Sequence, residues 1–199
     1  MTIYTIGHST RGFDELVAAL RGHGITTLVD IRAFPVSRRM PQFNREYLRV
    51  ELPKRGIAYV WLKELGGRRK KILKDSPNSA LRNESFRNYA DYMMTDEFER
   101  GIVELLRVVA QTDDPTLSAA AADDQDKAAS KGGTAIMCAE RMYFQCHRML
   151  VSDYLTAHGH MVLHIDDERR PVRQHTLISE ARLVDGKLVY DGGKLSWWG

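Results

Sequence analysis

The fold is indicated most clearly by residues 134–141, which read Thr-Ala-Ile-Met-Cys-Ala-Glu-Arg. The first four residues form an apolar run typical of a short buried strand, and the pattern over 141–158 predicts a helix. A strand that leads into a helix places the residues between them at the carboxyl end of a sheet, where open α/β folds bind ligands. Cys138, Glu140 and the sequence Cys-His-Arg at 146–148 fall in this region. We therefore expect a functional site here.

Strand and helix patterns alternate along the rest of the chain. Apolar runs predict four further strands, at Ile3–Ile6, Thr26–Ile31, Ile57–Trp61 and Met161–Ile165. Helical spacing predicts helices over Phe13–Arg21, Asn44–Arg55 and Phe86–Ala110, the last with a second start at Thr95–Asp96. Because strands that alternate with helices form parallel sheets, we expect an α/β Rossmann-like three-layer sandwich with a mainly parallel five-stranded sheet.

The length of the chain favours one domain. At 199 residues with 43% hydrophobic content, residues 1–199 can form a single α/β domain with a full core. Asp-Gly between two apolar runs predicts a C-terminal β-hairpin appendage over 180–191. Residues 112–133 are rich in Ala, Asp, Ser and Gly, and we interpret them as a flexible insertion because the sheet pattern resumes directly after them.

The sequence predicts a cytoplasmic protein that does not enter a membrane. No window approaches the roughly 18 unbroken apolar residues of a membrane helix. The first residues, Met-Thr-Ile-Tyr, lack the charged and apolar regions of a secretory signal. In that compartment Cys138 and Cys146 are expected to be thiols rather than a disulfide.

The net charge of +3 is unevenly distributed. Basic residues crowd the ranges 32–55 and 68–71, whereas acidic residues gather over 113–126. Such an asymmetry fits a basic face that meets an anionic small molecule or nucleic acid. A solvated basic loop explains it equally well. Nothing in the sequence indicates an oligomeric state.

Polar residues follow each predicted strand, and the carboxyl ends of parallel strands share one edge of a sheet. We therefore expect groups from four segments to converge on one cleft. The candidate catalytic residues are Asp30, Glu140, His8 and Cys138. The candidate substrate-binding residues are Ser9, Arg32, Ser37, Arg38, Phe43, Asn44, Arg141, Cys146, His147 and Arg148.

The charged candidates each have a functional and a structural interpretation. Asp30 and Glu140 can act as a general base or stabilise positive charge on a sugar carbon. They can equally belong to a buried ion-pair network that positions loops. His8 can transfer protons or make a structural hydrogen bond. Arg32 and Arg148 suit bidentate binding of phosphate or carboxylate.

The two cysteines leave several chemistries open. Cys138 is a nucleophile if a nearby cation or helix N-terminus lowers its pKa, and a small buried apolar group otherwise. Zinc could be held by Cys138, Cys146 and His147, but the spacing is not Cys-x-x-Cys and a fourth ligand must come from elsewhere, so we expect no metal. A tyrosine-phosphatase loop requires Arg where Phe144 stands. Without Gly-x-Gly-x-x-Gly or Walker sequences, no cofactor is expected.

Three segments resemble the domain-of-unknown-function 488 family. They are Tyr4–Ser9, the region from Leu28 to Pro41, and the Cys-x-Glu…Cys-His-Arg signature over 138–148. The resemblance covers most of the chain in the same order, although residues 112–133 depart from the compact pattern of the family. It implies a small α/β domain with no settled reaction and a loose association with DNA-repair proteins.

We predict an enzyme that acts on a phosphate-bearing nucleobase substrate, a nucleotide or DNA, as a hydrolase or in the manner of an N-glycosylase. Arginines would hold the phosphate, Phe34 or Phe43 would stack the base unless they are simple packing residues, and Asp30 or Glu140 would drive attack by water. One alternative is a non-catalytic nucleic-acid or nucleotide-binding module in which the carboxylates brace the arginines. A thiol or metal protein is the other.

Overall fold

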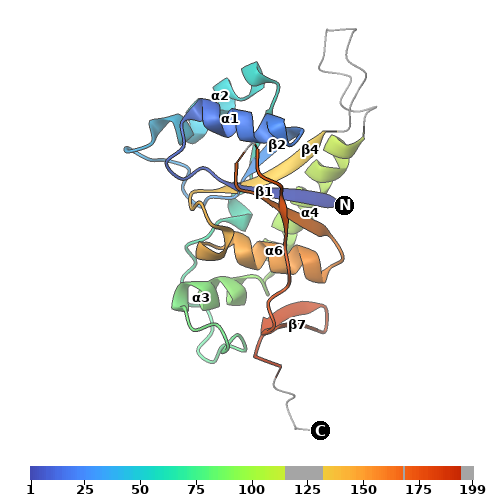
Figure 1. Cartoon of the computed structure of the whole chain (residues 1–199). Coiled ribbons are helices and arrows are strands. Elements are labelled where there is room, and N and C mark those ends of the chain that lie inside the picture. The colour runs from blue at the N-terminus through green and yellow to red at the C-terminus, as the bar shows by residue number, and fades with distance from the viewer. Residues whose placement is uncertain (115–131, 168, 194–199) are drawn as a thin grey trace.

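The elements of the protein form three layers around a central sheet (Figure 1). The computed structural model describes residues 1–114, 132–167 and 169–193. One face of the sheet is covered by helices α1 (Phe13–Gly22) and α2 (Arg45–Glu51). The other face carries α3 (Glu84–Tyr92), α4 (Asp96–Asp113) and α6 (Arg148–Ala157). The predicted α/β class is confirmed.

Within the described residues, the central sheet has six strands in the order β3-β2-β4-β1-β5-β6. Their bounds are β1 Thr2–Gly7, β2 Ile25–Asp30, β3 Ala58–Trp61, β4 Gly133–Cys138, β5 Met161–Ile165 and β6 Arg173–Gln174. The first five are parallel, and β6 pairs antiparallel with β5. The prediction of five strands missed β6 because two residues give no periodic signal.

The sheet separates the buried hydrophobic residues of the described part into two clusters. One cluster joins α1 and α2 to the sheet through residues such as Leu16, Leu20 and Leu48. The other joins α3, α4 and α6 to the opposite face, with Leu105 and Leu150 fully buried. The parallel strands are covered on both faces, so the predicted strands read as nearly continuous apolar runs.

The helix after β4 begins later than the sequence pattern predicts. A helix was expected over 141–158, but α6 starts at Arg148 and only a 3-10 turn, Tyr143–Gln145, precedes it. The guanidinium of Arg148 accounts for the difference, because it donates hydrogen bonds back to the carbonyl oxygens of Glu140 and Arg141. Residues between 139 and 147 are thereby held as a loop rather than as a helical turn.

The other predicted boundaries are closer to the structure. The break expected at Thr95 is confirmed, since its hydroxyl accepts a hydrogen bond from the backbone N–H of Phe98 and caps α4. The helix expected over 44–55 is α2 alone, which Pro53 follows as the first residue of a 3-10 turn, Pro53–Arg55.

The predicted hairpin is present as β7 (Ala181–Val184) and β8 (Lys187–Tyr190). Its turn residues Asp185 and Gly186 have φ values of 50° and 76°, as a type I′ turn requires. The proposed flexible insertion over 112–133 falls mostly outside the described residues, because α4 extends to Asp113, β4 begins at Gly133 and 115–131 are not described.

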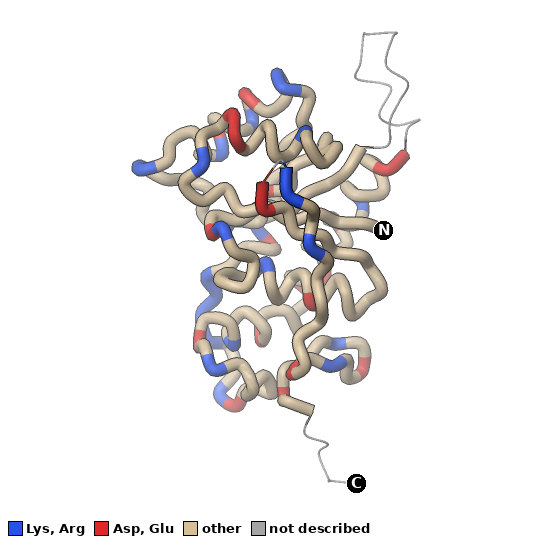
Figure 2. The backbone as a smooth tube through the Cα atoms, viewed as in Figure 1, with Lys and Arg blue, Asp and Glu red and all other residues tan. Residues whose placement is uncertain are grey.

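Charges of both signs are interspersed along the described chain (Figure 2). The basic stretch over 32–55 is partly compensated by exposed ion pairs, including Lys54 with Glu51 at 2.6 Å and Arg55 with Asp14 at 3.0 Å. Most of the acidic range 113–126 lies outside the described residues. None of the helices in the described part combines the length and hydrophobicity needed to cross a membrane.

Candidate functional site

A pocket of about 510 Å³ lies at the carboxyl ends of β2, β3 and β4. Arg32 and Phe34 follow β2, Arg68 follows β3, and Cys138 and Glu140 end or follow β4. The chain leaves β1 over one face of the sheet and leaves β4 over the other, so these neighbouring strands form the topological switch point of the sheet. Open α/β sheets bind their ligands at such a point.

The ends of β1 and β4 are tied together directly below this pocket. The backbone N–H of His8 donates to the carbonyl of Cys138 at 3.0 Å, and that of Ser9 donates to Ala139 at 2.8 Å. Gly7 lies at this junction, where a Cβ atom would collide with the Glu140 carbonyl and with the Arg148 guanidinium. The first predicted motif is therefore in contact with the Cys-x-Glu segment.

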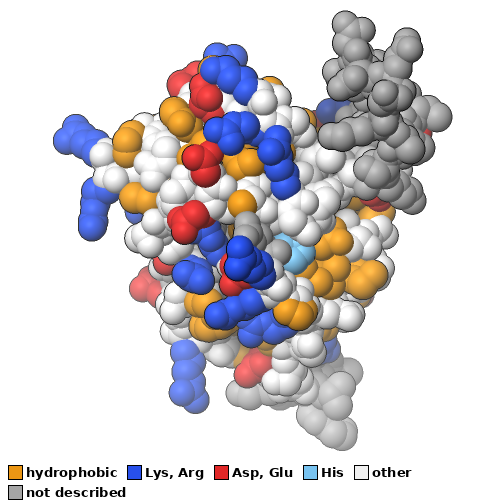
Figure 3. Space-filling view, turned by 45° about the horizontal axis from the view of Figure 1, so that its top comes forward, with side chains coloured by type: hydrophobic (Ala, Val, Ile, Leu, Met, Phe, Trp, Pro, Cys, Tyr) orange, Lys and Arg blue, Asp and Glu red, His pale blue; other side chains and the backbone are white. Residues whose placement is uncertain are grey.

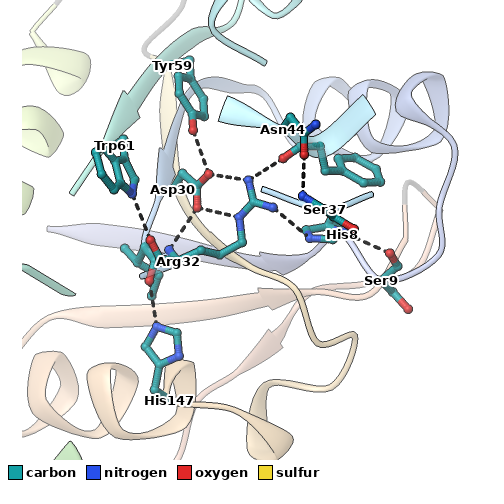
Figure 4. Close-up of polar contacts among 11 residues, drawn as sticks. His8, Ser9, Asp30, Arg32, Ser37, Asn44, Tyr59, Trp61 and His147 are labelled. Atoms are coloured by element: carbon teal, nitrogen blue, oxygen red, sulfur yellow. Dashed lines mark hydrogen bonds and ion pairs between the residues drawn. The ribbon is translucent and has the colours of Figure 1, made fainter. Parts of the chain in front are cut away.

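Asp30 and Arg32 form a buried ion pair, and Arg32 also lines the pocket (Figure 4). Asp30 Oδ1 accepts hydrogen bonds from Arg32 N at 3.0 Å and Nε at 2.9 Å. Its Oδ2 accepts from Arg32 Nη2 at 2.6 Å and from Tyr59 OH at 2.7 Å. Asp30 is fully buried, so its oxygens are committed to protein donors. This geometry is that of a structural ion pair, called the Asp30–Arg32 brace below, rather than of a base that activates water.

His8 is held as a neutral ring in the same network. Its Nδ1 donates to the carbonyl of Ser9 at 2.9 Å, and its Nε2 therefore accepts from Arg32 Nη1 at 3.2 Å. Burial and then the positive charge of Arg32 lower the pKa of His8 to about 4. The ring also stacks on Phe43 at a centroid distance of 4.2 Å.

The loop after β2 places its candidates differently from the prediction. Phe43 is fully buried and its carbonyl accepts from Arg32 Nη2, which fits the packing interpretation of this residue rather than base stacking. Asn44 Oδ1 accepts from the backbone N–H of Ser37 at 2.6 Å and so holds the turn (Figure 4). Phe34, in contrast, is 70% exposed and lines the pocket.

Cys138 and His147 meet at the wall of the pocket. His147 Nε2 lies 2.9 Å from the carbonyl oxygen of Ile31 and must donate to it (Figure 4). The other ring nitrogen, Nδ1, therefore carries a lone pair, which lies 3.7 Å from Cys138 Sγ. Gly67 leaves room for the imidazole, because a Cβ there would lie 2.7 Å from Nδ1.

Both sulfurs are free and buried, and their pKa values move in opposite directions. A hydrogen bond from Cys146 is the largest cause that lowers the pKa of Cys138 to about 7, and the charge of Arg148 and backbone N–H groups act in the same direction. The hydrogen bond with Cys138, then burial and the charge of Cys138, raise the pKa of Cys146.

Arg148 is 1% exposed and serves as a buried cation behind the sulfurs. Its Nε donates to Cys146 Sγ at 3.3 Å, while Nη2 donates to the carbonyls of Glu140 and of Arg141, the latter at 3.0 Å. These contacts fix the loop that carries Glu140. The guanidinium is therefore committed to the protein, and its predicted binding of phosphate has no free donor face to use.

A buried chain of hydrogen bonds leads away from Arg148. Since Arg148 Nη1 can only donate, Thr5 Oγ1 accepts from it at 3.4 Å and donates to His164 Nδ1 at 2.8 Å. His164 Nε2 then donates to His175 Nδ1 at 3.0 Å, and His175 Nε2 donates to Asp153 at 2.9 Å. Burial and the charge of His175 lower the pKa of His164 to about 3, which keeps this link neutral. The sequence patterns gave no sign of this chain, because its members come from separate elements.

The structure divides the predicted site residues into three groups. Arg32, Cys138, Glu140, Cys146 and His147 line the pocket. Asp30, His8, Ser9, Ser37, Phe43, Asn44 and Arg148 support it from behind or hold its loops. Arg38 is exposed on the loop, and Arg141 lines a separate cavity beside α1. The roles of these residues in catalysis and binding stay predictions.

Several residues that line the pocket were not among the candidates, Tyr89 and Arg68 among them. Tyr89 of α3 lines the pocket, and its position could not be read from a helix pattern. Arg68 is exposed with a φ of 50°, and it has no hydrogen-bond or ion-pair partner among the described residues. Non-glycine residues with positive φ are strained and gather at functional sites. In the sequence, the position of Arg68 in the basic run 68–71 was the signal that could have marked it as a candidate.

Basic, acidic and hydrophobic side chains are interspersed over one face of the molecule (Figure 3). Basic and hydrophobic groups are both present in the pocket as well. Within the pocket itself, exposed Arg68 and Phe34 provide one group of each kind.

One cluster in the described residues has the composition of a metal site. Cys138 Sγ, Cys146 Sγ and a ring nitrogen of His147 all lie within 4.8 Å of one another, and all three residues are buried. The sequence spacing had argued against such a cluster.

Comparison with known families gives one match. A family model described as domain of unknown function DUF488 matches residues 12–126, more than half of the chain. The matched range contains the Asp30–Arg32 brace and ends before Cys138. No curated protein and no solved structure matches the chain.

Proposed function

Because the chain belongs to the DUF488 family, which brings no known reaction, we propose a function from the site: hydrolysis of a phosphate-bearing nucleobase substrate, a nucleotide or DNA. The reaction would take place in the pocket at the carboxyl ends of β2, β3 and β4. Hydrolysis of the N-glycosidic bond of such a substrate is included in this proposal.

The proposal rests on the position of Glu140. Its side chain is exposed, it lines the pocket, and its carboxylate has no hydrogen-bond or ion-pair partner among the described residues. Its backbone is nevertheless fixed, because the carbonyl accepts from Arg148. Asp30 differs, since both of its oxygens are occupied. Glu140 is thus the carboxylate available to a substrate or to water.

The substrate class follows from the other pocket walls. Arg68 offers an uncommitted guanidinium, which suits a phosphate group. Phe34 offers an exposed ring against which a nucleobase can stack. A ligand that carries both an anionic group and an aromatic ring would contact both residues.

In the proposed reaction, the Glu140 carboxylate accepts a proton from water as the water oxygen attacks the substrate carbon or phosphorus. The bond to the leaving group breaks, and the leaving group takes up a proton from protonated Glu140 or from solvent. A positioned general base contributes about 10²–10⁴-fold to such a step.

The test is a comparison of Glu140→Gln with the wild type. Nucleotides and short DNA with modified bases are screened for release of base, ammonia or phosphate, and binding is measured by calorimetry. We expect Glu140→Gln to bind the identified substrate nearly as the wild type does, and to lose about 10²-fold or more in turnover because the base is gone. Glu46→Gln is the matched control, an exposed carboxylate on α2 outside the pocket.

A non-catalytic nucleotide-binding module is the second candidate function, and the Asp30–Arg32 ion pair favours it. Asp30 holds Arg32 in place without a free oxygen of its own, as a purely structural carboxylate would. Under that function, Glu140→Gln binds as before and neither protein turns over any substrate. Full turnover by Glu140→Gln would refute the role of Glu140 as the general base, and absence of turnover by the wild type would refute the hydrolase.

A further inference from the structure

We propose that Cys138, Cys146 and His147 bind a zinc-type divalent cation, with a fourth coordination position that opens on the pocket. Binding of the ion does not depend on the proposed function. Its chemical role, given below, rests on that function.

The spacing of the three ligand atoms fits a tetrahedral ion. With zinc–sulfur and zinc–nitrogen distances of about 2.3 Å and 2.0–2.1 Å, neighbouring ligand atoms of a tetrahedron lie roughly 3.5–3.8 Å apart. Cys138 Sγ and His147 Nδ1 are 3.7 Å apart, and all three ligand atoms lie within 4.8 Å of one another. Only small side-chain rotations would bring them onto one ion.

The imidazole is already prepared as a ligand. Because His147 Nε2 donates to the Ile31 carbonyl, Nδ1 has its lone pair free and directed toward the sulfurs. Histidines that bind metals usually donate their other N–H to a carbonyl or carboxylate in this way. Gly67 leaves the space that this ring orientation needs.

The sulfurs also have the partners expected of thiolate ligands. Arg148 Nε donates to Cys146 Sγ at 3.3 Å, and Arg148 itself is held by the chain that ends at Asp153. Two thiolates and a divalent ion sum to zero charge, which suits a site where all three ligand residues are buried.

The fold removes the objection raised by the sequence spacing. Cys138 ends β4, whereas Cys146 and His147 return to it from the loop before α6. Three protein ligands with one open position are the arrangement of catalytic zinc sites, in which water or substrate takes the fourth place. All three residues line the pocket, so the open position faces it.

An ion at this place would bind the attacking water beside Glu140, two residues after Cys138. The bound water would give a proton to Glu140 as its oxygen attacks the substrate carbon; the bond from that carbon to the leaving group would then break, and the leaving group would take up the proton from Glu140. Two cysteines and a histidine on zinc, with a glutamate that is not a ligand, also perform hydrolytic deamination of nucleobases in other proteins. Cytosine and adenine nucleotides, assayed for ammonia release, are therefore the first substrates to test.

The experiment uses the reduced full-length chain, stripped of metal and titrated with Co²⁺ or Zn²⁺ alone. We expect one ion per chain and the visible absorption of tetrahedral cobalt–thiolate coordination, which Zn²⁺ abolishes. Cys138→Ser, Cys146→Ser and His147→Gln should each weaken binding more than 100-fold, since loss of even an outer-shell partner costs roughly 10–100-fold. His158→Gln, which changes an exposed histidine at the C-terminal cap of α6, is the control.

A second measurement requires no variant. Saturating Zn²⁺ should protect both thiols of the native wild type from alkylation, because they become ligands. The inference is overturned if the wild type binds no ion stoichiometrically, or if Zn²⁺ leaves both alkylation rates unchanged. An ion bound without any turnover supports the metal site and counts against the hydrolase, whereas turnover without an ion does the reverse.

Discussion

The Asp30–Arg32 brace gives the sharpest stability prediction. Replacement of Asp30 by Ala removes four hydrogen bonds, three from Arg32 and one from Tyr59, and leaves the guanidinium buried without its counterion. Breaking a buried pair by removing one partner costs about 3–5 kcal/mol. Tyr59→Phe removes only one hydrogen bond to a charged oxygen, so it should cost about 1–3 kcal/mol. We expect the free energy of unfolding to fall in that order.

Urea unfolding followed by tryptophan fluorescence measures these losses. Trp61 reports on the region directly, because its Nε1 donates to the Arg32 carbonyl at 2.9 Å. In a double-mutant cycle, Asp30→Ala with Arg32→Met should lose less than the sum of the single changes by about 1–3 kcal/mol, since no charge is then left unpaired. Additive losses, or a loss below about 1 kcal/mol for Asp30→Ala, would contradict the brace.

The same variants separate structure from catalysis. If Asp30→Asn keeps the stability of the wild type and loses turnover, Asp30 acts on the substrate and the assignment to Glu140 is wrong. If Asp30→Asn loses stability and turnover together, the brace acts by positioning. The Glu46→Gln control should change neither quantity.

Three further predictions follow from the supports of the site. Gly67→Ala should displace His147, because the new Cβ would lie 2.7 Å from Nδ1. Calorimetric titration should therefore show weaker Zn²⁺ binding. The control Gly12→Ala, whose new Cβ has its nearest neighbour at 3.5 Å, should bind Zn²⁺ as the wild type does. Below pH 6.5 His8 becomes protonated in the unfolded chain, whereas in the folded protein it stays neutral until about pH 4. The free energy of unfolding should therefore fall as the pH falls through that window. An NMR titration of the His8 imidazole with a midpoint near 6.5 would refute this prediction. Asp153→Asn should cost about 1–3 kcal/mol in urea unfolding, because a buried acceptor of the hydrogen-bond chain loses its charge, and an unchanged midpoint would contradict the chain.

Much of the fold could be predicted from periodicity. The buried parallel strands read as apolar runs, and Thr95 and Asp185-Gly186 marked a helix start and a turn by local chemistry alone. The start of α6 could not be read in this way. It depends on Arg148 turning back to the carbonyls of Glu140 and Arg141, a contact that helical spacing does not encode.

The candidate site was predictable in location but not in the orientation of its side chains. Parallel strands brought the chosen segments to one edge, as expected from the sheet order. Sequence could not tell that Phe43 faces inward while Phe34 and Arg68 face the pocket, because all three lie in or beside basic loops. Those directions are set by long-range hydrogen bonds and by packing.

The most direct measurement is a crystal structure of the Glu140→Gln variant soaked with a cytosine or adenine nucleoside monophosphate. We expect the base to lie against Phe34, the phosphate to contact Arg68, and the reacting carbon to face residue 140 and the Cys138 sulfur. A nucleotide bound instead in the separate cavity lined by Arg11 and Arg141, with the pocket empty, would contradict the assignment of the active site.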